Sequence, residues 1–359
     1  MLKVYHKYLI NIFLIKFFKI TMIFFSLICI LGILEEINFF KEIKSSGLYP
    51  YFLTLLNAPI TLFEIFPFIF LIVTQFVLYD LFKNDELNLL KQNGLSNFKI
   101  IKIFFFLSLA IGIFNVLVYY NISSKLKFHY SNIKNTFSND NRYLAMVTDS
   151  GLWIKDEVGE NTLIIKSNYI RGNYLTDTVI NQFNSDFELT RTIQSKKVDI
   201  TDFTWKIYSP LITKDNISNK TEETIYIKTN FNEKKISNLF SNISTLNLIK
   251  LIDLKKDFDR LGYSSDEVVI HLLTLCTVPL LYSILTLLAA VIVFNFSKNR
   301  SILTHLITGI LMSVVIYYMK FIFTSLGTNG KLPIFVSIFF PLVIISIISV
   351  ISLVNINEK

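Results

Sequence analysis

Long apolar stretches separated by short polar ones dominate the chain. Six of these stretches reach about the 20 residues that an α-helix needs to cross the hydrocarbon core of a bilayer. They lie at about 20 to 40, 57 to 79, 100 to 120, 270 to 294, 303 to 325 and 333 to 355. The pattern predicts three membrane spans in 1–120, a long polar segment, and three further spans in 269–359.

The polar segment, residues 121–268, carries a second pattern. From Tyr143 onward, short runs that mix apolar and polar residues are separated by clusters of Asn, Asp, Gly and Ser, as in the run from Thr224 to Ile227. This pattern is typical of antiparallel strands joined by turns, and it predicts an all-β sandwich or jelly roll. The interior is either packed or opened as an apolar groove. Residues from about 246 to 260 predict a helix that connects this domain back to the membrane.

Composition agrees with an α-helical membrane protein. The 359 residues are 52% hydrophobic and include 34 Phe, and the mean hydropathy is +0.51, which lies outside the usual range of soluble chains. Charged residues make up 17% of the chain and are grouped between apolar runs. The net charge of +8 therefore describes no uniformly basic surface and argues against nucleic-acid binding. Cys29 and Cys276 both lie in apolar stretches, so the polar segment has no disulfide.

The basic residues beside the spans predict orientation, because Lys and Arg collect on the cytoplasmic side of a membrane. One side carries Lys3, Lys7, Lys16, Lys19, Lys83, Lys91, Lys99, Lys102, Lys298, Arg300 and Lys359, and the other carries only Lys41, Lys44 and Lys331. Both termini and the loop at 80–99 are therefore expected in the cytoplasm, and the domain at 121–268 outside it. We expect no cleaved signal peptide, because Glu35 and Glu36 follow the first apolar run in place of a small-x-small site.

No recognisable catalytic or metal-binding motif is present in the sequence. The string most similar to an ATP-binding P-loop, Gly327 to Leu332, has the wrong spacing and no hydroxyl after Lys331. The histidines are scattered without the spacing of metal ligands, at His6, His129, His271 and His305. We therefore expect a chain that is not an enzyme, binds no metal or cofactor, and does not itself hydrolyse ATP.

The cytoplasmic loop from Asn84 to Gly94 is the first candidate functional segment. Asn84 is placed to cap a short helix with acidic residues in its first turn, and Gly94 is placed to end it in a left-handed conformation. Either an interfacial connector or a docking helix for a cytoplasmic partner fits these residues. The candidate docking residues are Asp85, Glu86, Leu87, Leu90, Lys91 and Gly94, of which Leu87, Leu90 and Lys91 are expected near one face.

Charged residues inside the spans form the second candidate site. Glu35 and Glu36 lie toward the end of the first span, and Lys320 interrupts the fifth. An isolated charge at the centre of a span costs roughly 2.5 to 3.5 kcal/mol on insertion scales, so a partner or a polar cavity is expected. Both positions fall in the outer third of the bilayer, so pairing between the spans is feasible. The alternative is that each side chain extends to the outer interface. Glu64 in the second span is a further candidate for a polar lining.

The order of these parts resembles the LptF/LptG permease family of the lipopolysaccharide export transporter, and the resemblance covers nearly the whole chain. Residues Asp85 to Ser96 are similar to the coupling segment of the family, and Leu152 to Asp156 are similar to the L-W-x-[KR]-D string that opens the LptG-type periplasmic domain. Weaker matches lie at Leu55 to Pro59 with Phe66 and Pro67, Asp202 to Trp205, Leu261 to Tyr263, and Thr308 to Ile310. Their order and spacing make the resemblance specific.

The resemblance implies a jelly-roll periplasmic domain on a protein of the bacterial inner membrane. It also implies several partners: a sister permease (LptF-like), a cytoplasmic ATPase (LptB-like) that uses the ATP, a single-span jelly-roll protein (LptC-like) and a periplasmic bridge of jelly rolls (LptA-like). The cargo would be lipopolysaccharide, extracted from the inner membrane and passed to the bridge. By this analogy the loop at about 84–94 is the coupling helix, with Glu86 on the acidic position of the family, and spans one and five form lateral gates.

One departure from the family concerns the gate charges. Members of the LptG type carry a basic residue near the outer end of span one and an acid in span five, whereas this chain has Glu35 or Glu36 and Lys320 there. We hypothesise that the charges have been exchanged and a pair preserved. The loss of the basic group also puts a phosphate contact on span one in doubt.

Three alternatives to an LptG-type permease fit the sequence less well. An LptF-type half is disfavoured by the string Leu152 to Asp156 and by a chain that ends soon after span six. A membrane sensor with an extracytoplasmic ligand domain would need a separate output partner, because the cytoplasmic loops are short. An intramembrane enzyme would need clustered catalytic side chains, which the spans lack.

Overall fold

The computed structural model describes residues 4–43, 47–137, 152–214, 217–221, 223–233, 235–236, 242–261, 264–295 and 302–357. Some residues used above lie outside these ranges, namely Lys3, Lys44, Tyr143, Gly262, Tyr263, Lys298, Arg300 and Lys359. The chain forms two compact units, which we call the helical unit (Met1–Tyr130 with Asp266–Lys359) and the β unit (Ser131–Ser265). Each is described by itself below.

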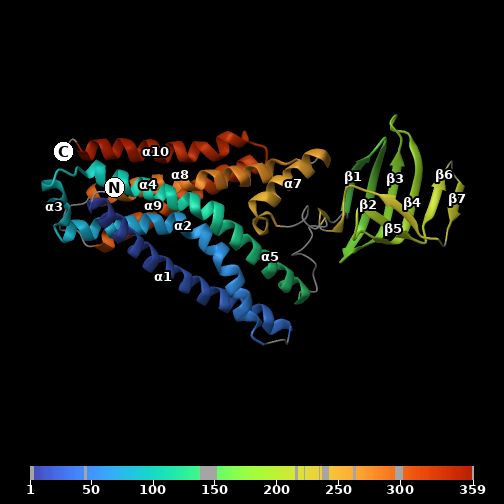
Figure 1. The fold of residues 1–359 in the computed structure, drawn as a ribbon, viewed down its shortest axis with the longest axis horizontal. Coiled ribbons are helices and arrows are strands. Elements are labelled where there is room, and N and C mark those ends of the chain that lie inside the picture. The colour runs from blue at the N-terminus through green and yellow to red at the C-terminus, as the bar shows by residue number, and fades with distance from the viewer. Residues whose placement is uncertain are drawn as a thin grey trace. The chain divides into compact units, whose positions relative to one another are not determined.

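Six long apolar helices form the helical unit, as the hydropathy pattern predicts (Figure 1). They are α1 Val4–Ile43, α2 Tyr49–Lys83, α4 Asn97–Phe114 continued through the π-helical turn η1 Asn115–Tyr119 into α5 Tyr120–Phe137, α8 Asp266–Asn295, α9 Ile302–Thr328 and α10 Ile334–Asn357. Each is long and apolar enough to cross a membrane, so the chain is a multi-pass membrane protein. The helices extend beyond the apolar stretches, and Lys7, Lys16 and Lys19 therefore lie on α1 itself.

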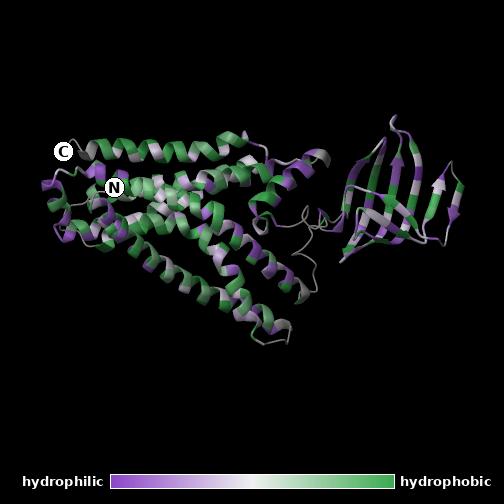
Figure 2. Ribbon diagram, in the orientation of Figure 1, coloured by the Kyte–Doolittle hydropathy of each residue, from purple (hydrophilic) through white to green (hydrophobic). Residues whose placement is uncertain are grey.

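Burial within the helical unit identifies α2 and α8 as its central helices. In their most apolar windows 67% and 78% of residues are buried, compared with 11% in α1 and 6% in α9. The central core combines Leu71 of α2 with Leu281 and Leu288 of α8 and Leu342 of α10. Figure 2 shows that hydrophobic residues also cover the outer faces of these helices, as expected where lipid or another protein surrounds them.

Polar side chains connect several helices inside this apolar unit. The Gln75 amide of α2 donates to the backbone oxygen of His305 on α9 at 3.0 Å, and the Ser108 and Thr286 hydroxyls of α4 and α8 lie 2.8 Å apart. Such hydrogen bonds between helices are a common source of specificity in membranes. They fix the rotation of α4 and α9 against the central pair.

Gly112 permits close packing of α4 on α8. A Cβ atom at this position would lie 2.6 Å from the backbone Cα of Pro279, which cannot move aside as a flexible side chain would. We therefore expect Gly112→Val to destabilise the helical unit by roughly 1–3 kcal/mol through overpacking. Thermal unfolding in detergent checks this, with Ala110→Val on the exposed side of α4 as the matched control. Equal midpoints for the two variants would contradict the close approach.

The β unit is an antiparallel sheet of eight strands (Figure 1). They are β1 Leu152–Val158, β2 Asn161–Arg171, β3 Tyr174–Phe183, β4 Leu189–Asp199, β5 Thr204–Tyr208, β6 Leu211–Lys214, β7 Ile217–Lys220 and β8 Ile225–Lys228. The path runs β1-β2-β3-β4-β5-β8, while β6 pairs with β4 and β7. The first two hairpins turn at Gly159 and Gly172, whose φ angles of +65° and +55° suit tight turns of two residues. The expected class, a helical membrane protein with an inserted β domain, is confirmed.

One face of the sheet forms the core of the β unit. Buried and exposed residues alternate along β1, so that Leu152 and Ile154 are both 1% exposed, whereas Trp153 between them is 43% exposed. Trp205 of β5 is fully buried on the inner face, and its indole N–H donates to the backbone oxygen of Phe231 at 2.7 Å. The strand-and-turn prediction is thus confirmed by a period-two burial pattern.

The predicted connecting helix is also confirmed, as α7 Leu248–Leu261. It follows a short 3₁₀ turn, η3 Ile243–Thr245, which the Asn242 side chain caps by accepting from the Ser244 N–H at 3.0 Å. Leu251 and Leu254 are buried, whereas Ile249 and Ile252 remain exposed. The helix is therefore amphipathic, with a buried apolar face and exposed apolar residues only near its beginning.

Asp199, at the end of β4, gives the β unit a weak dependence on pH. Its carboxylate accepts from the side-chain hydroxyl of Thr201 at 2.6 Å and from the Thr201 N–H at 3.0 Å, and these hydrogen bonds hold its pKa below the ordinary value. A lowered folded-state pKa contributes stability above the unfolded-state pKa, near 3.9, that is lost as the pH falls through the folded-state value.

We expect Thr201→Val to lower the free energy of unfolding of the β unit slightly at pH 7, by less than about 1 kcal/mol because the carboxylate is exposed, and so to lower its thermal midpoint. The difference should shrink toward pH 3. Thr221→Val, which removes a hydroxyl without a hydrogen bond among the described residues, is the control. A deficit that stays constant from pH 7 to pH 3 would exclude the carboxylate as its cause.

Candidate functional site

The loop predicted as a coupling segment contains a seven-residue helix, α3 Glu86–Gln92. The expectation that Asn84 caps it is wrong, because α2 continues to Lys83 and Asn84 ends that helix with its N–H on the Asp80 oxygen at 3.0 Å. Asp85 instead forms the junction in a left-handed conformation, with φ of 58° and no side-chain capping bond. Gly94 ends the segment as predicted, with φ of +81° and its N–H 2.9 Å from the Lys91 oxygen.

The side chains of α3 divide into an inner and an outer set. Leu87 is 1% exposed and Leu90 is half-buried. Lys91, expected on their face, is exposed, and Leu89 is 57% exposed. A partner that docks on this helix would therefore meet Leu89 and Lys91. Leu89 was not among the predicted residues, although its offset from Leu87 and Leu90 at 100° per residue places it on the outer side.

Glu86 makes a contact that the local pattern did not indicate. The Tyr8 hydroxyl of α1 donates to Glu86 Oε2 at 2.5 Å. Farther along α1, Lys16 Nζ lies 2.5 Å from Asp80 Oδ2 near the end of α2. The beginning of α1 is thus connected to both sides of the junction between α2 and α3. No sequence signal identifies these pairs, because their members lie more than sixty residues apart.

Two neighbouring glutamates near the C-terminal end of α1 differ in environment. Glu36 is 2% exposed, and its Oε1 accepts from the Tyr130 hydroxyl of α5 at 2.8 Å. Glu35 is exposed. Of the two, Glu35 is therefore the carboxylate that remains accessible to a group outside the helical unit.

Lys320 lies in α9 and is half-buried within the chain. Among the residues that the structure describes, it forms no ion pair, and the pair expected with Glu35 or Glu36 is not formed within this chain. The reason is the packing: α1 lies chiefly on α2 and α4, whereas α9 lies on α10, α2 and α8. The role of all three residues in a gate stays a prediction.

A polar cluster surrounds Glu64, the third intramembrane candidate. Glu64 of α2 interacts electrostatically with Lys127 of α5, and Lys127 interacts in turn with His271 of α8. The Tyr120 hydroxyl lies 2.9 Å from His271 Nε2. Three helices therefore meet around charged and polar groups, as expected of a polar lining in a membrane protein.

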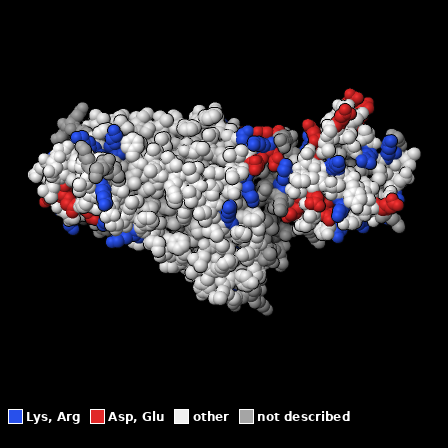
Figure 3. All heavy atoms as spheres, viewed as in Figure 1, with Lys and Arg blue, Asp and Glu red and all other residues white. Residues whose placement is uncertain are grey.

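Charged residues on the visible face of the helical unit gather near its ends (Figure 3). Lys, Arg, Asp and Glu cluster at the end that carries α3, and a broad stretch of uncharged surface follows. This distribution fits helices that cross a hydrocarbon layer with α3 on one side of it.

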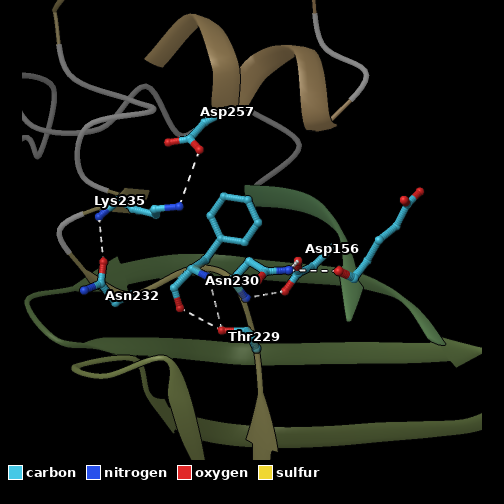
Figure 4. A network of polar contacts seen from close by, with 8 residues as sticks. Asp156, Thr229, Asn230, Asn232, Lys235 and Asp257 are labelled. Carbon is cyan, nitrogen blue, oxygen red and sulfur yellow. Dashed lines mark hydrogen bonds and ion pairs between the residues drawn. The ribbon is translucent and has the colours of Figure 1, made fainter. Parts of the chain in front are cut away.

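The β unit has its own polar network where β1 meets α7 (Figure 4). Asp156 is 3% exposed and accepts from the backbone and side-chain nitrogens of Asn230, both at 2.8 Å. Lys235 Nζ lies 3.4 Å from Asp257 Oδ1 on α7. A cavity of about 370 Å³ opens between them, lined by Lys155, Asp156, Glu157, Asn230, Phe231, Lys235 and Asp257. Its charges of both signs do not suit an acyl chain.

No group of His, Cys, Asp and Glu that would hold a metal ion occurs in the described parts of the chain.

The family profile described as "Lipopolysaccharide export system permease LptF/LptG" matches residues 7–355, nearly the full length. No protein of curated function matches the chain.

Proposed function

The chain belongs to the LptF/LptG family of lipopolysaccharide export system permeases, and on this premise we propose that it is the LptG-type half of such a transporter. In this role it extracts lipopolysaccharide from the inner membrane and passes it to a periplasmic bridge. The family match over residues 7–355 is the observation that carries the proposal. The string Leu152 to Asp156, which forms the beginning of β1, favours the G-type half.

The proposed orientation places α3 in the cytoplasm and the β unit in the periplasm. It is supported by the Lys-rich flanks on the side of α3 and by the charge distribution on the helical unit (Figure 3). A single-span jelly-roll protein and the bridge then continue from the β unit.

A sister permease of the LptF type is the proposed partner of α1 and α9. These helices are the least buried of the six, with 11% and 6% of their most apolar windows buried. Exposed apolar residues cover both of them, including Phe18, Met22, Leu31, Leu311, Val315 and Phe321. The two contact surfaces that α1 and α9 form with the sister permease would be the lateral gates for lipopolysaccharide. Glu35, Glu36 and Lys320 would lie toward the outer ends of these gates.

The cytoplasmic partner in this proposal is an ATPase that docks on α3. Its contact residues on this chain are Leu89 and Lys91, which are exposed, together with Asp85 at the helix junction. ATP binding and hydrolysis take place in that subunit, and the permease converts its motion into movement of the spans.

Affinity purification tests the proposal. The tagged chain is isolated from its native membrane in mild detergent, and the retained proteins and lipids are identified by mass spectrometry. A second six-span permease, an ATPase and lipopolysaccharide are the expected companions. A chain that is purified alone, or with a signalling kinase and no glycolipid, would contradict an exporter. A companion permease that itself carries the L-W-x-[KR]-D string would reverse the assignment of the two halves.

A further inference from the structure

The first turns of α1 are fixed to the segment that leads into and through α3. Tyr8 donates to Glu86 of α3 at 2.5 Å, and Lys16 lies 2.5 Å from Asp80 of α2. These residues of α1 are eight positions apart, roughly 12 Å along the helix. Two polar contacts therefore join the same end of α1 to both sides of the α2–α3 junction.

Buried apolar residues anchor both helices beside these polar contacts. Leu9, Phe13, Phe17 and Ile20 follow one another at helical spacing, and each is less than 9% exposed. On the other side, Leu87 anchors α3 with 1% exposure. The Glu86 carboxylate and the Tyr8 hydroxyl thus belong to two anchored helices. Their hydrogen bond is therefore a specific link between α1 and α3.

The middle of α1 is held far less firmly. No residue from 21 to 35 is buried within the chain, and burial resumes only at Glu36 and Phe40. Helix α1 is thus anchored toward both ends and loosely packed between them, so that displacing its first turns would tilt or bend its middle. Movement of α3 would therefore displace the exposed apolar face of α1.

We infer that Tyr8 is a positioning residue that transmits the motion of α3 to α1 through its hydrogen bond to Glu86, and so links the ATPase to the gate span. This inference rests on the proposed function, in which an ATPase moves α3 and α1 lines a gate. Glu86 then acts on α1 of its own chain, and is not simply an acidic group offered to the ATPase.

Two substitutions separate these roles. Tyr8→Phe removes the hydroxyl and keeps the ring and the charge of Glu86, so it breaks the link alone. Glu86→Gln keeps a side-chain oxygen that accepts from Tyr8 but removes the charge. Tyr5→Phe is the matched control, because Tyr5 lies on the same turns of α1 and its hydroxyl forms no hydrogen bond among the described residues.

The complex purified with the tagged chain is reconstituted into proteoliposomes that contain lipopolysaccharide. ATP hydrolysis, retention of the ATPase, and lipopolysaccharide released per ATP hydrolysed are measured for each variant. We expect Tyr8→Phe to retain the ATPase and to hydrolyse ATP, but to release roughly fivefold less lipopolysaccharide per ATP, the effect of one hydrogen bond to a charged group at a partly exposed site. Glu86→Gln should release more per ATP than Tyr8→Phe.

Three results would overturn the inference. The first is equal lipopolysaccharide release by Tyr8→Phe and Tyr5→Phe, and the second is loss of the ATPase from the Tyr8→Phe complex. The third is a double variant, Tyr8→Phe with Glu86→Ala, whose loss of release is the sum of the two single losses, since coupled partners give non-additive effects. If the unsubstituted complex itself releases no lipopolysaccharide with ATP, the proposed function fails instead. The two failures are therefore distinguishable.

Discussion

Trp205→Ala is expected to lower the free energy of unfolding of the β unit by roughly 3–5 kcal/mol, the usual cost of truncating a large buried aromatic residue to alanine. Trp205 is fully buried on the inner face of the sheet. The backbone oxygen of Phe231 would lose the indole donor at 2.7 Å but keep the Thr229 hydroxyl, also at 2.7 Å. Most of the loss is therefore attributed to the cavity.

Pulse proteolysis across a urea series measures this loss on the full chain in detergent. The other tryptophan of the chain provides the control: Trp153→Ala, on the outer face and 43% exposed, should cost far less. Trp205→Phe refills part of the cavity and should give an intermediate value if the alanine variant does not accumulate. Equal resistance of Trp205→Ala and Trp153→Ala would show that the two faces of the sheet have been assigned wrongly.

The elements that the sequence predicted well are those with a strong period. Apolar runs long enough to cross a bilayer give the spans, and the alternating run from Thr224 to Ile227 gives β8. The residues at which the helices begin and end were predicted less well. Helix α1 begins at Val4, well before its apolar run, because basic residues continue a helix as readily as apolar ones do.

The short helix α3 illustrates how a local rule fails in context. Asn84 has the right chemistry for an N-cap, but the preceding helix α2 continues through Lys83 and uses Asn84 for its own end. Asp85, with its left-handed φ of 58°, makes the turn between the two helices. Gly94 was predicted correctly because a left-handed helix end favours glycine whatever surrounds it.

The candidate site required knowledge of the fold, because its contacts join distant segments. Tyr8 and Glu86 belong to different helices, as do Glu36 and Tyr130. An intramembrane charge indicates from sequence only that some partner is needed. The structure assigns Glu36 to Tyr130 and so leaves Glu35 as the exposed one of these two glutamates.

Lys320→Glu is expected to give the largest loss of transport among the gate variants. Lys320 has no ion pair within the described part of the chain, and α9 is the least buried helix. We propose that an acid on the first span of the sister permease faces Lys320. Reversing the charge would oppose two like charges inside the membrane, and we expect the rate of lipopolysaccharide release to fall by roughly ten- to a hundredfold, which corresponds to about 1.4–2.7 kcal/mol in the barrier.

The release assay in proteoliposomes tests this expectation, with Lys331→Glu in the exposed turn after α9 as the matched control. Lys320→Arg should retain release, because it keeps the charge. A pair within one chain predicts that Glu35→Lys restores release to Lys320→Glu. Because α1 and α9 of one chain pack on different neighbours, we now expect no recovery from that double variant. Reversing an acid on the first span of the sister permease should restore lipopolysaccharide release to Lys320→Glu. If Glu35→Lys restores it instead, the two charges face each other at the same gate.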